Sequence, residues 1–166
     1  MLLGLSKIID CPGASLPFST SLDLSDLRFG TCCPVSEPVN AEGIVRNTAG
    51  VMMMTGAIRT CLHGICDRCA GEFTRDVEIP INVVLVTELA DEDNEDEGVF
   101  PLEADAADLD DIIRTIFVLN MDSKLLCKPD CKGLCCRCGK NLNDGPCGCQ
   151  KEIDPRLAAL RQLLDK

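Results

Sequence analysis

The sequence predicts an α+β protein made of an antiparallel β-sheet body with a packed helix, a small cysteine-rich tail and a C-terminal helix. Three observations support this fold class. The first half of the chain contains several stretches in which apolar and polar residues alternate, as they do in half-buried strands. An amphipathic helix pattern follows the strands, and seven of the 13 cysteines then fall within residues 127–149. We therefore expect a body over residues 1–122, a tail over residues 123–152 and a helix over residues 153–166.

Two of the predicted strands contain a proline. Residues 16–25 alternate apolar and polar side chains, and Pro17 lies near their start. Residues 73–89 are rich in β-branched side chains, and Pro80 lies near their middle. Proline has no N–H group to donate to a strand ladder, so each of these strands is expected at a sheet edge or at a bulge.

Two further strands, residues 34–46 and 51–61, are predicted to form a hairpin. The segment Asn47-Thr-Ala-Gly50 between them is typical of a tight turn. The run Met52-Met-Met54 lies at the start of the second strand, and one interpretation is soft-metal binding. We favour packing within the strand, because methionine commonly fills gaps in apolar cores.

One helix is predicted after the strands. The apolar side chains of residues 109–117 recur at the i, i+3, i+4, i+7 and i+8 positions of a single helix face, and Asp108 can cap the N-terminus. The earlier run Asp91–Glu97 holds six acids in seven residues, so we expect a solvated loop there. Residues 153–166 predict a second helix, with a capping aspartate, a proline in the first turn and leucines along one face.

The composition excludes several classes of protein. A net charge of −11 and an aromatic content of 3% argue against a DNA-coating protein and against a base-stacking surface. No apolar run reaches the roughly 18 residues that a membrane helix needs. The sequence has one histidine, no Gly-rich phosphate loop and no serine nucleophile elbow, so we predict that the protein is not an enzyme.

The cysteine count indicates metal binding rather than a disulfide framework. The count is odd, and no secretory cleavage site follows the start of the chain, so a cytoplasmic protein is expected. Cysteines in that compartment more often bind metal than form disulfides.

The tail carries the strongest motif. Cys135-Cys-Arg-Cys138-Gly139 and Cys147-Gly-Cys149 supply two pairs of thiols, and the turn-rich segment between them can bring the pairs together. Four thiolates form the tetrahedral site that Zn²⁺ prefers, so we predict a zinc-ribbon-like tail. The predicted ligands are Cys135, Cys138, Cys147 and Cys149, with Cys127 or Cys131 as an alternative to one of them.

A second motif, Cys66-Asp-Arg-Cys69, is open to three interpretations. We favour a hairpin tip with two packed thiols. The alternatives are half of a metal site that Cys127 and Cys131 complete, and a redox pair, although the βαβ context of a thioredoxin-like motif is missing. We interpret His63, the only histidine, as an exposed loop residue rather than as a ligand.

Several motifs follow one another along nearly the whole chain. They are Leu22-Asp-Leu-Ser25, residues 34–43, the segment Cys66–Phe73, the helix start Asp108–Ile113, and the tail segment Cys131–Asn143 followed by Cys147-Gly-Cys149. In these motifs the chain resembles the YceD family, the large-ribosomal-subunit rRNA accumulation proteins. Two positions depart from the usual pattern, Cys136 for proline and Ala70 for leucine, and neither is a predicted ligand. The resemblance implies a role in rRNA accumulation and ribosome assembly.

The charge of the chain is divided between its two parts. Residues 1–122 hold 7 basic and 22 acidic side chains, whereas residues 123–166 hold 9 basic and 5 acidic side chains. Such an asymmetry suggests that the two parts meet different partners. With the family resemblance, it predicts a non-enzymatic ribosome biogenesis factor whose body binds a basic large-subunit ribosomal protein or a pre-ribosomal particle, and whose tail can contact rRNA. The basic residues of the tail near the cysteines are Lys124, Lys128, Lys132, Arg137 and Lys140.

Two other classes remain as alternatives. One is a cytosolic dithiol oxidoreductase that uses Cys66 and Cys69 as its redox pair. The other is a zinc-ribbon adaptor in transcription.

Overall fold

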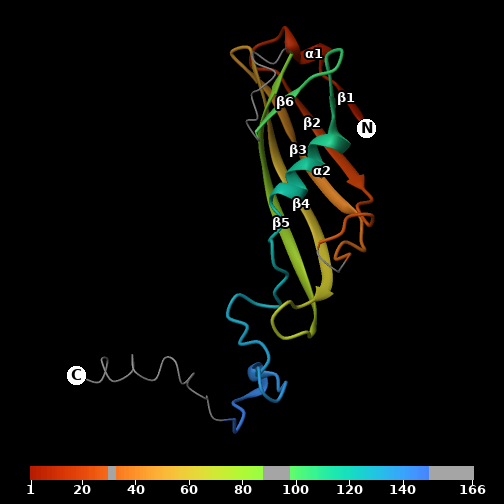
Figure 1. The fold of residues 1–166 in the computed structure, drawn as a ribbon. Helices are drawn as coiled ribbons and strands as arrows, with labels where there is room; N and C mark the ends of the chain where they lie inside the picture. Colours follow the sequence, from red (N-terminus) through yellow and green to blue (C-terminus); the bar gives the residue numbers. More distant parts are fainter. Residues whose placement is uncertain (30–32, 88–97, 150–166) are drawn as a thin grey trace, which may run out of the picture.

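The computed structural model describes residues 1–29, 33–87 and 98–149 of the chain. A long, twisted five-stranded sheet forms the body, with its strands in the order β2-β3-β4-β5-β6 (Figure 1). Neighbouring strands are antiparallel except for β5 and β6, which run parallel. The strands of this sheet are β2 (Ser15–Leu22), β3 (Val39–Thr48), β4 (Val51–Ile65), β5 (Glu72–Val86) and β6 (Val99–Pro101).

Four predicted strands are present, with shifted ends and one topological difference. The strand predicted over residues 34–46 begins only at Val39, because Val35 makes just an isolated bridge to Leu62. The strand predicted to end at residue 61 continues to Ile65. The sheet is antiparallel, as predicted, except at one edge, where β6 pairs in parallel with the last three residues of β5. A three-residue strand carries too little sequence pattern to reveal its direction.

The two strand prolines lie at edges, as predicted. Pro17 is on β2, which is the outermost strand of the sheet. Pro80 is on β5 opposite Ala57, and β6 pairs with β5 only from Val84 onward. Each proline therefore lies where one side of its strand is unpaired, which is where a missing N–H group is tolerated.

The turn between β3 and β4 is a two-residue hairpin, as the sequence predicted. Ala49 and Gly50 both have positive φ angles, of 53° and 93°, which is the requirement of a type I′ turn. Asn47 is fully buried beside this turn, where its side-chain amide donates hydrogen bonds to the carbonyls of Ile8 and Ile9 at 2.8 and 2.7 Å. Its Oδ1 accepts a 2.8 Å hydrogen bond from the Gly50 N–H, so one side chain joins the turn to the N-terminal segment.

The core lies between one face of the sheet and helix α2 (Leu109–Leu119) (Figure 1). Alternate residues of the strands point into it, including Met52 and Met54, so these two methionines serve packing, as we favoured, whereas Met53 is only partly buried. Phe117 of α2 is fully buried and makes an edge-to-face contact with Phe29, with ring centroids 6.5 Å apart. The predicted apolar stripe of the helix is wholly buried, and it consists of Leu109, Ile112, Ile113, Ile116 and Phe117.

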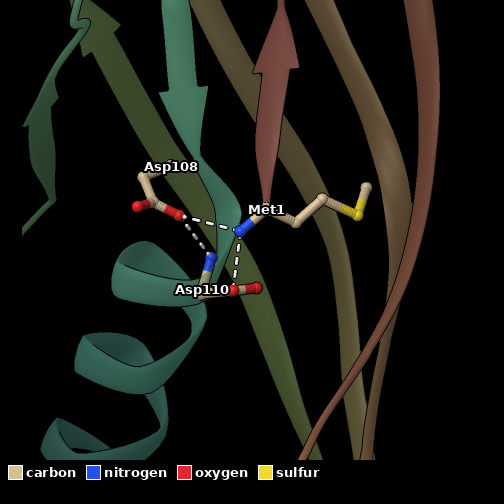
Figure 2. Close-up of polar contacts among 3 residues, drawn as sticks. All are labelled: Met1, Asp108 and Asp110. Atoms are coloured by element: carbon tan, nitrogen blue, oxygen red, sulfur yellow. Dashed lines mark hydrogen bonds and ion pairs between the residues drawn. The ribbon is translucent and has the colours of Figure 1, made fainter.

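A second, two-stranded sheet covers the start of α2. β1 (Leu2–Gly4) pairs antiparallel with β7 (Ala106–Asp108), and a short helix, α1 (Ser6–Ile9), follows β1. This pairing brings the Met1 amino group to the helix cap, where it contacts Asp108 at 3.3 Å and Asp110 at 2.6 Å (Figure 2). Asp108 also accepts a hydrogen bond from the Asp110 N–H, as the sequence predicted for an N-cap. The hydrogen bond from the Met1 amino group is the main reason that the pKa of Asp108 is lowered.

The cysteine-rich tail, which follows α2 in the sequence, lies next to the tip of the β4–β5 hairpin, at the opposite end of the sheet from α1 (Figure 1). Its described residues, 123–149, contain one short 3₁₀ turn, η1 (Leu142–Asp144), and one isolated bridge between Leu134 and Asn141. The predicted helix over 153–166 and the acidic run Asp91–Glu97 lie outside the described residues. Among the described residues, no helix has both the length and the apolar character that crossing a bilayer requires.

Candidate metal centres

The tip of the β4–β5 hairpin holds the Cys66-x-x-Cys69 motif. The Cys66 N–H donates to the Gly71 carbonyl at 2.9 Å, and the Ala70 N–H donates to the Cys66 carbonyl at 2.9 Å. Ala70 adopts a positive φ of 52° to close this turn. The turn directs both thiols inward, and Cys66 and Cys69 are only 1% and 7% exposed.

Backbone contacts fasten the first part of the tail to this tip. The Asp67 N–H donates to the Leu125 carbonyl at 2.8 Å, and the Leu125 N–H donates back to the Asp67 carboxylate at 2.7 Å. Arg68 donates to the Cys131 carbonyl at 3.2 Å, and its own carbonyl accepts a 3.1 Å hydrogen bond from the Leu134 N–H. These contacts hold the chain on both sides of Cys127 and Cys131 against the hairpin.

Four thiols therefore meet at the junction of body and tail, and we call Cys66, Cys69, Cys127 and Cys131 the inner cluster. Their sulfur atoms all lie within 4.8 Å of one another. The Cys66 and Cys131 sulfurs are 3.8 Å apart, and the Cys69 and Cys127 sulfurs are also 3.8 Å apart. All four cysteines are free thiols, and Phe73 and Leu126 pack against them. The four can hold one metal ion.

The surroundings of the inner cluster push the pKa values of its thiols apart. Burial raises the pKa of Cys66, but backbone N–H groups of Cys127, Cys69 and Arg68 outweigh it and lower that pKa to about 6. Burial together with the neighbouring thiols raises the pKa of Cys127 to about 12. The side-chain amide of Asn143, 3.3 Å from the Cys131 sulfur, is the main cause that lowers the pKa of Cys131. Donors to sulfur favour the thiolate, which is the form that binds metal.

A second group of thiols lies within the tail, and we call Cys135, Cys138, Cys147 and Cys149 the outer cluster. Their sulfur atoms also lie within 4.8 Å of one another, so these four can hold a metal ion as well. They are the residues whose spacing predicted a zinc site. The structure brings all four together, and it places the two suggested substitutes, Cys127 and Cys131, in the inner cluster instead.

Local turns assemble the outer cluster. The Gly139 N–H donates to the Cys135 carbonyl at 2.9 Å, and Gly139 has a φ of +70°, which a residue with a Cβ rarely adopts. The Arg137 N–H lies 3.5 Å from the Cys135 sulfur, and the N–H groups of Cys138 and Arg137 are the main causes that lower the pKa of Cys135 to about 6. Hydrogen bonding with Cys138 is the main cause that raises the pKa of Cys149 to about 12.

Asn143 connects the two clusters, and sequence reasoning did not identify it. It lies in η1, between the two halves of the outer cluster, and its amide nitrogen donates to the Cys131 sulfur of the inner cluster. Its Oδ1 accepts a 2.9 Å hydrogen bond from the Lys132 N–H. The only sequence signal was its place in a turn-rich segment, which many asparagines share.

The remaining sequence candidates lie apart from both clusters. His63 belongs to strand β4 rather than to a loop, is exposed as expected, and contacts Thr74 at 3.2 Å and Glu37 at 3.3 Å. Cys61 lies two residues before it on the same strand, where burial raises the pKa of the thiol. Cys136 is exposed within the tail, and neither cluster includes it.

Comparisons with known proteins identify relatives over most of the chain. The sequence model of the YceD family, described as the large ribosomal RNA subunit accumulation protein YceD, matches residues 54–164. This range contains all eight cysteines of the two clusters. No solved structure matches the chain.

Individual relatives extend the match toward the N-terminus. Uncharacterized proteins of Mycobacterium tuberculosis and Mycobacterium bovis are 28% identical over 122 residues, which cover 72% of this chain and 59% of each relative. The chloroplastic large ribosomal RNA subunit accumulation protein YCED homolog 1 of Arabidopsis thaliana is 28% identical over 158 residues, covering 78% of this chain and 47% of that protein. The chain thus spans about half to three fifths of the length of these curated relatives.

Proposed function

This chain belongs to the YceD family, and from that premise we propose that it is a non-enzymatic factor in the biogenesis of the large ribosomal subunit, acting in the cytoplasm. The description of the family and that of the plant relative both name accumulation of large-subunit rRNA. The observation that carries the proposal is the match of the family over residues 54–164, which include α2 and both cysteine clusters.

The body is proposed to bind a basic large-subunit ribosomal protein or a pre-ribosomal particle. Its described part holds 15 acidic and 7 basic residues. Several of the basic side chains already have acidic partners: Arg59 pairs with Glu42 and Glu78, and Arg114 pairs with Asp26 at 2.5 Å. The surface that remains is therefore acidic, which attracts basic partners and repels RNA.

The tail is proposed to contact rRNA phosphates. Five basic residues lie between positions 123 and 149 against two acids, and the side chains of all five are exposed. In this proposal the outer cluster holds Zn²⁺ as a structural ion, which would fix the tail in a shape that presents these side chains. Zinc in a site of four thiolates supplies folding energy and no chemistry. The five residues are Lys124, Lys128, Lys132, Arg137 and Lys140.

Charge variants of the full chain test this division of roles. Binding of Lys124→Gln/Lys128→Gln/Lys132→Gln and of wild type to isolated large-subunit precursor particles is measured between 50 and 500 mM salt (roughly a threefold change in Debye length). Each phosphate contact that is lost should reduce the slope of log affinity against log salt by about 0.7–0.9. The matched variant neutralises the acids of residues 91–97, and it should slow association with a basic ribosomal protein without weakening RNA binding.

Two results would overturn the proposal. The first is that wild type and both variants all fail to bind large-subunit precursors at 50 mM salt, which contradicts the ribosomal role. The other is that the lysine variant binds as wild type does at every salt concentration, which contradicts an RNA contact by the tail.

A further inference from the structure

We propose that the inner cluster is a second zinc site, separate from the outer one, and that its ion is the joint between body and tail. Cys66 and Cys69 come from the body hairpin, whereas Cys127 and Cys131 come from the tail. A single ion held by all four would bind the two parts together. This inference rests on the geometry of the cluster and does not depend on the ribosomal role.

The distances between the sulfurs fit a tetrahedral zinc site. With Zn–S bonds of about 2.3 Å, a regular tetrahedron separates its sulfur atoms by about 3.8 Å. The Cys66–Cys131 and Cys69–Cys127 sulfur pairs are each 3.8 Å apart. Each of these pairs joins one body cysteine to one tail cysteine, so the matching distances are the ones that span the junction. Tetrahedral four-sulfur sites are typical of zinc or iron, and zinc is the ion expected at a purely structural site.

A hydrogen bond to one sulfur of the cluster also fits a bound thiolate. Cys131 receives the side-chain amide of Asn143. Buried negative sulfur needs such donors and a cation, because an uncompensated charge in the interior is costly. Neutral packed thiols, which the sequence had favoured for Cys66 and Cys69, need neither.

Burial should make the two ions differ in how fast they are lost. Three inner cysteines are at most 7% exposed, and Phe73 and Leu126 pack against the site. In the outer cluster Cys138 is exposed and the other three cysteines are partly exposed. A chelator can therefore reach the outer ion directly, whereas the inner ion becomes accessible only when the tail detaches from the hairpin.

The test measures zinc content and zinc release on the full chain, purified without chelator. Elemental analysis of wild type should give two equivalents of zinc. A chromophoric chelator should then remove them in two phases of equal amplitude. Cys138→Ser/Cys149→Ser should retain one equivalent and show only the slow phase. The matched control, Cys136→Ser, replaces an exposed tail thiol outside both clusters and should behave as wild type.

The inner cluster is tested directly with Cys66→Ser/Cys131→Ser, which should lose the slow phase. The outer-cluster variant is decisive, because it leaves the junction of body and tail intact. The proposal is overturned if wild type holds a single equivalent, if Cys138→Ser/Cys149→Ser holds none, or if the retained metal is iron.

Discussion

Each of the two clusters consists of four cysteine thiols, but the clusters differ in the length of chain that each one closes into a loop. The outer cluster draws its residues from a 15-residue segment, Cys135–Cys149. The inner cluster joins residues that are 58 and 65 positions apart, across strands β5, β6 and β7, helix α2 and the junction. A locally closed site organises only its own loop, whereas a site closed over a long segment fixes two parts of a protein to each other. The same ligand set can thus serve as the core of a small tail or as a joint.

The largest effect should come from removing one outer ligand. Cys138→Ser is expected to unfold residues 135–149, because structural zinc contributes about 10–16 kcal/mol of apparent binding free energy in zinc-finger peptides and this segment has little apolar core. The body should stay folded, since its core of sheet and α2 does not include the tail. Hydrogen exchange resolved by residue will show whether loss of protection stops at the outer cluster.

The residues that lose hydrogen-exchange protection in Cys138→Ser show whether the two clusters are independent. Protection that is retained at Leu125 and Leu134, whose N–H groups bond to the hairpin tip, would show that the inner joint is independent. If protection disappears at both of these amides as well, the two clusters form one cooperative unit, and the inner cluster is not an independent joint.

A smaller effect is expected from the residue that connects the clusters. Asn143→Ala removes the donor to the Cys131 sulfur and leaves the four inner ligands in place. Loss of an outer-shell partner typically lowers metal affinity about 10–100-fold, so competition with a chelator of known affinity should show a loss of this size at the slowly released ion.

Asn143→Asp is the informative companion to this variant. It keeps the acceptor for the Lys132 N–H but places a carboxylate beside the Cys131 sulfur. Its loss of affinity should exceed that of the alanine variant. Equal affinities for wild type and both variants would mean that Asn143 does not support the site.

No effect is expected on disulfide reductase activity when Cys66 and Cys69 are replaced. Thiol–disulfide exchange needs a sulfur that a substrate disulfide can reach, and Cys66 and Cys69 are 1% and 7% exposed and face two other thiols. Cys66→Ser/Cys69→Ser should therefore leave any disulfide reductase activity of the preparation unchanged. A clear loss of activity in this variant would support the oxidoreductase class instead.

Sequence reasoning found what is local and missed what is assembled at a distance. Three features are formed by residues that lie close together in the sequence, so the sequence pattern alone indicates them. They are the apolar stripe on α2, the Ala49-Gly50 turn and the outer cluster. The β1–β7 pair was missed because each strand has three residues and the partners are about a hundred positions apart. Completion of the inner cluster by Cys127 and Cys131 was one of three open interpretations, since it depends on contacts such as Asp67 with Leu125 that spacing does not encode.

The length of strand β4 has a consequence for what the molecule can reach. Its 15 residues, at about 3.3 Å each, span about 50 Å from the turn beside α1 to the hairpin tip where the tail is attached. A small globular domain is about 30 Å across, so a partner of that size cannot touch both ends at once. The sheet therefore separates the tail from the α1 end by more than the width of such a partner.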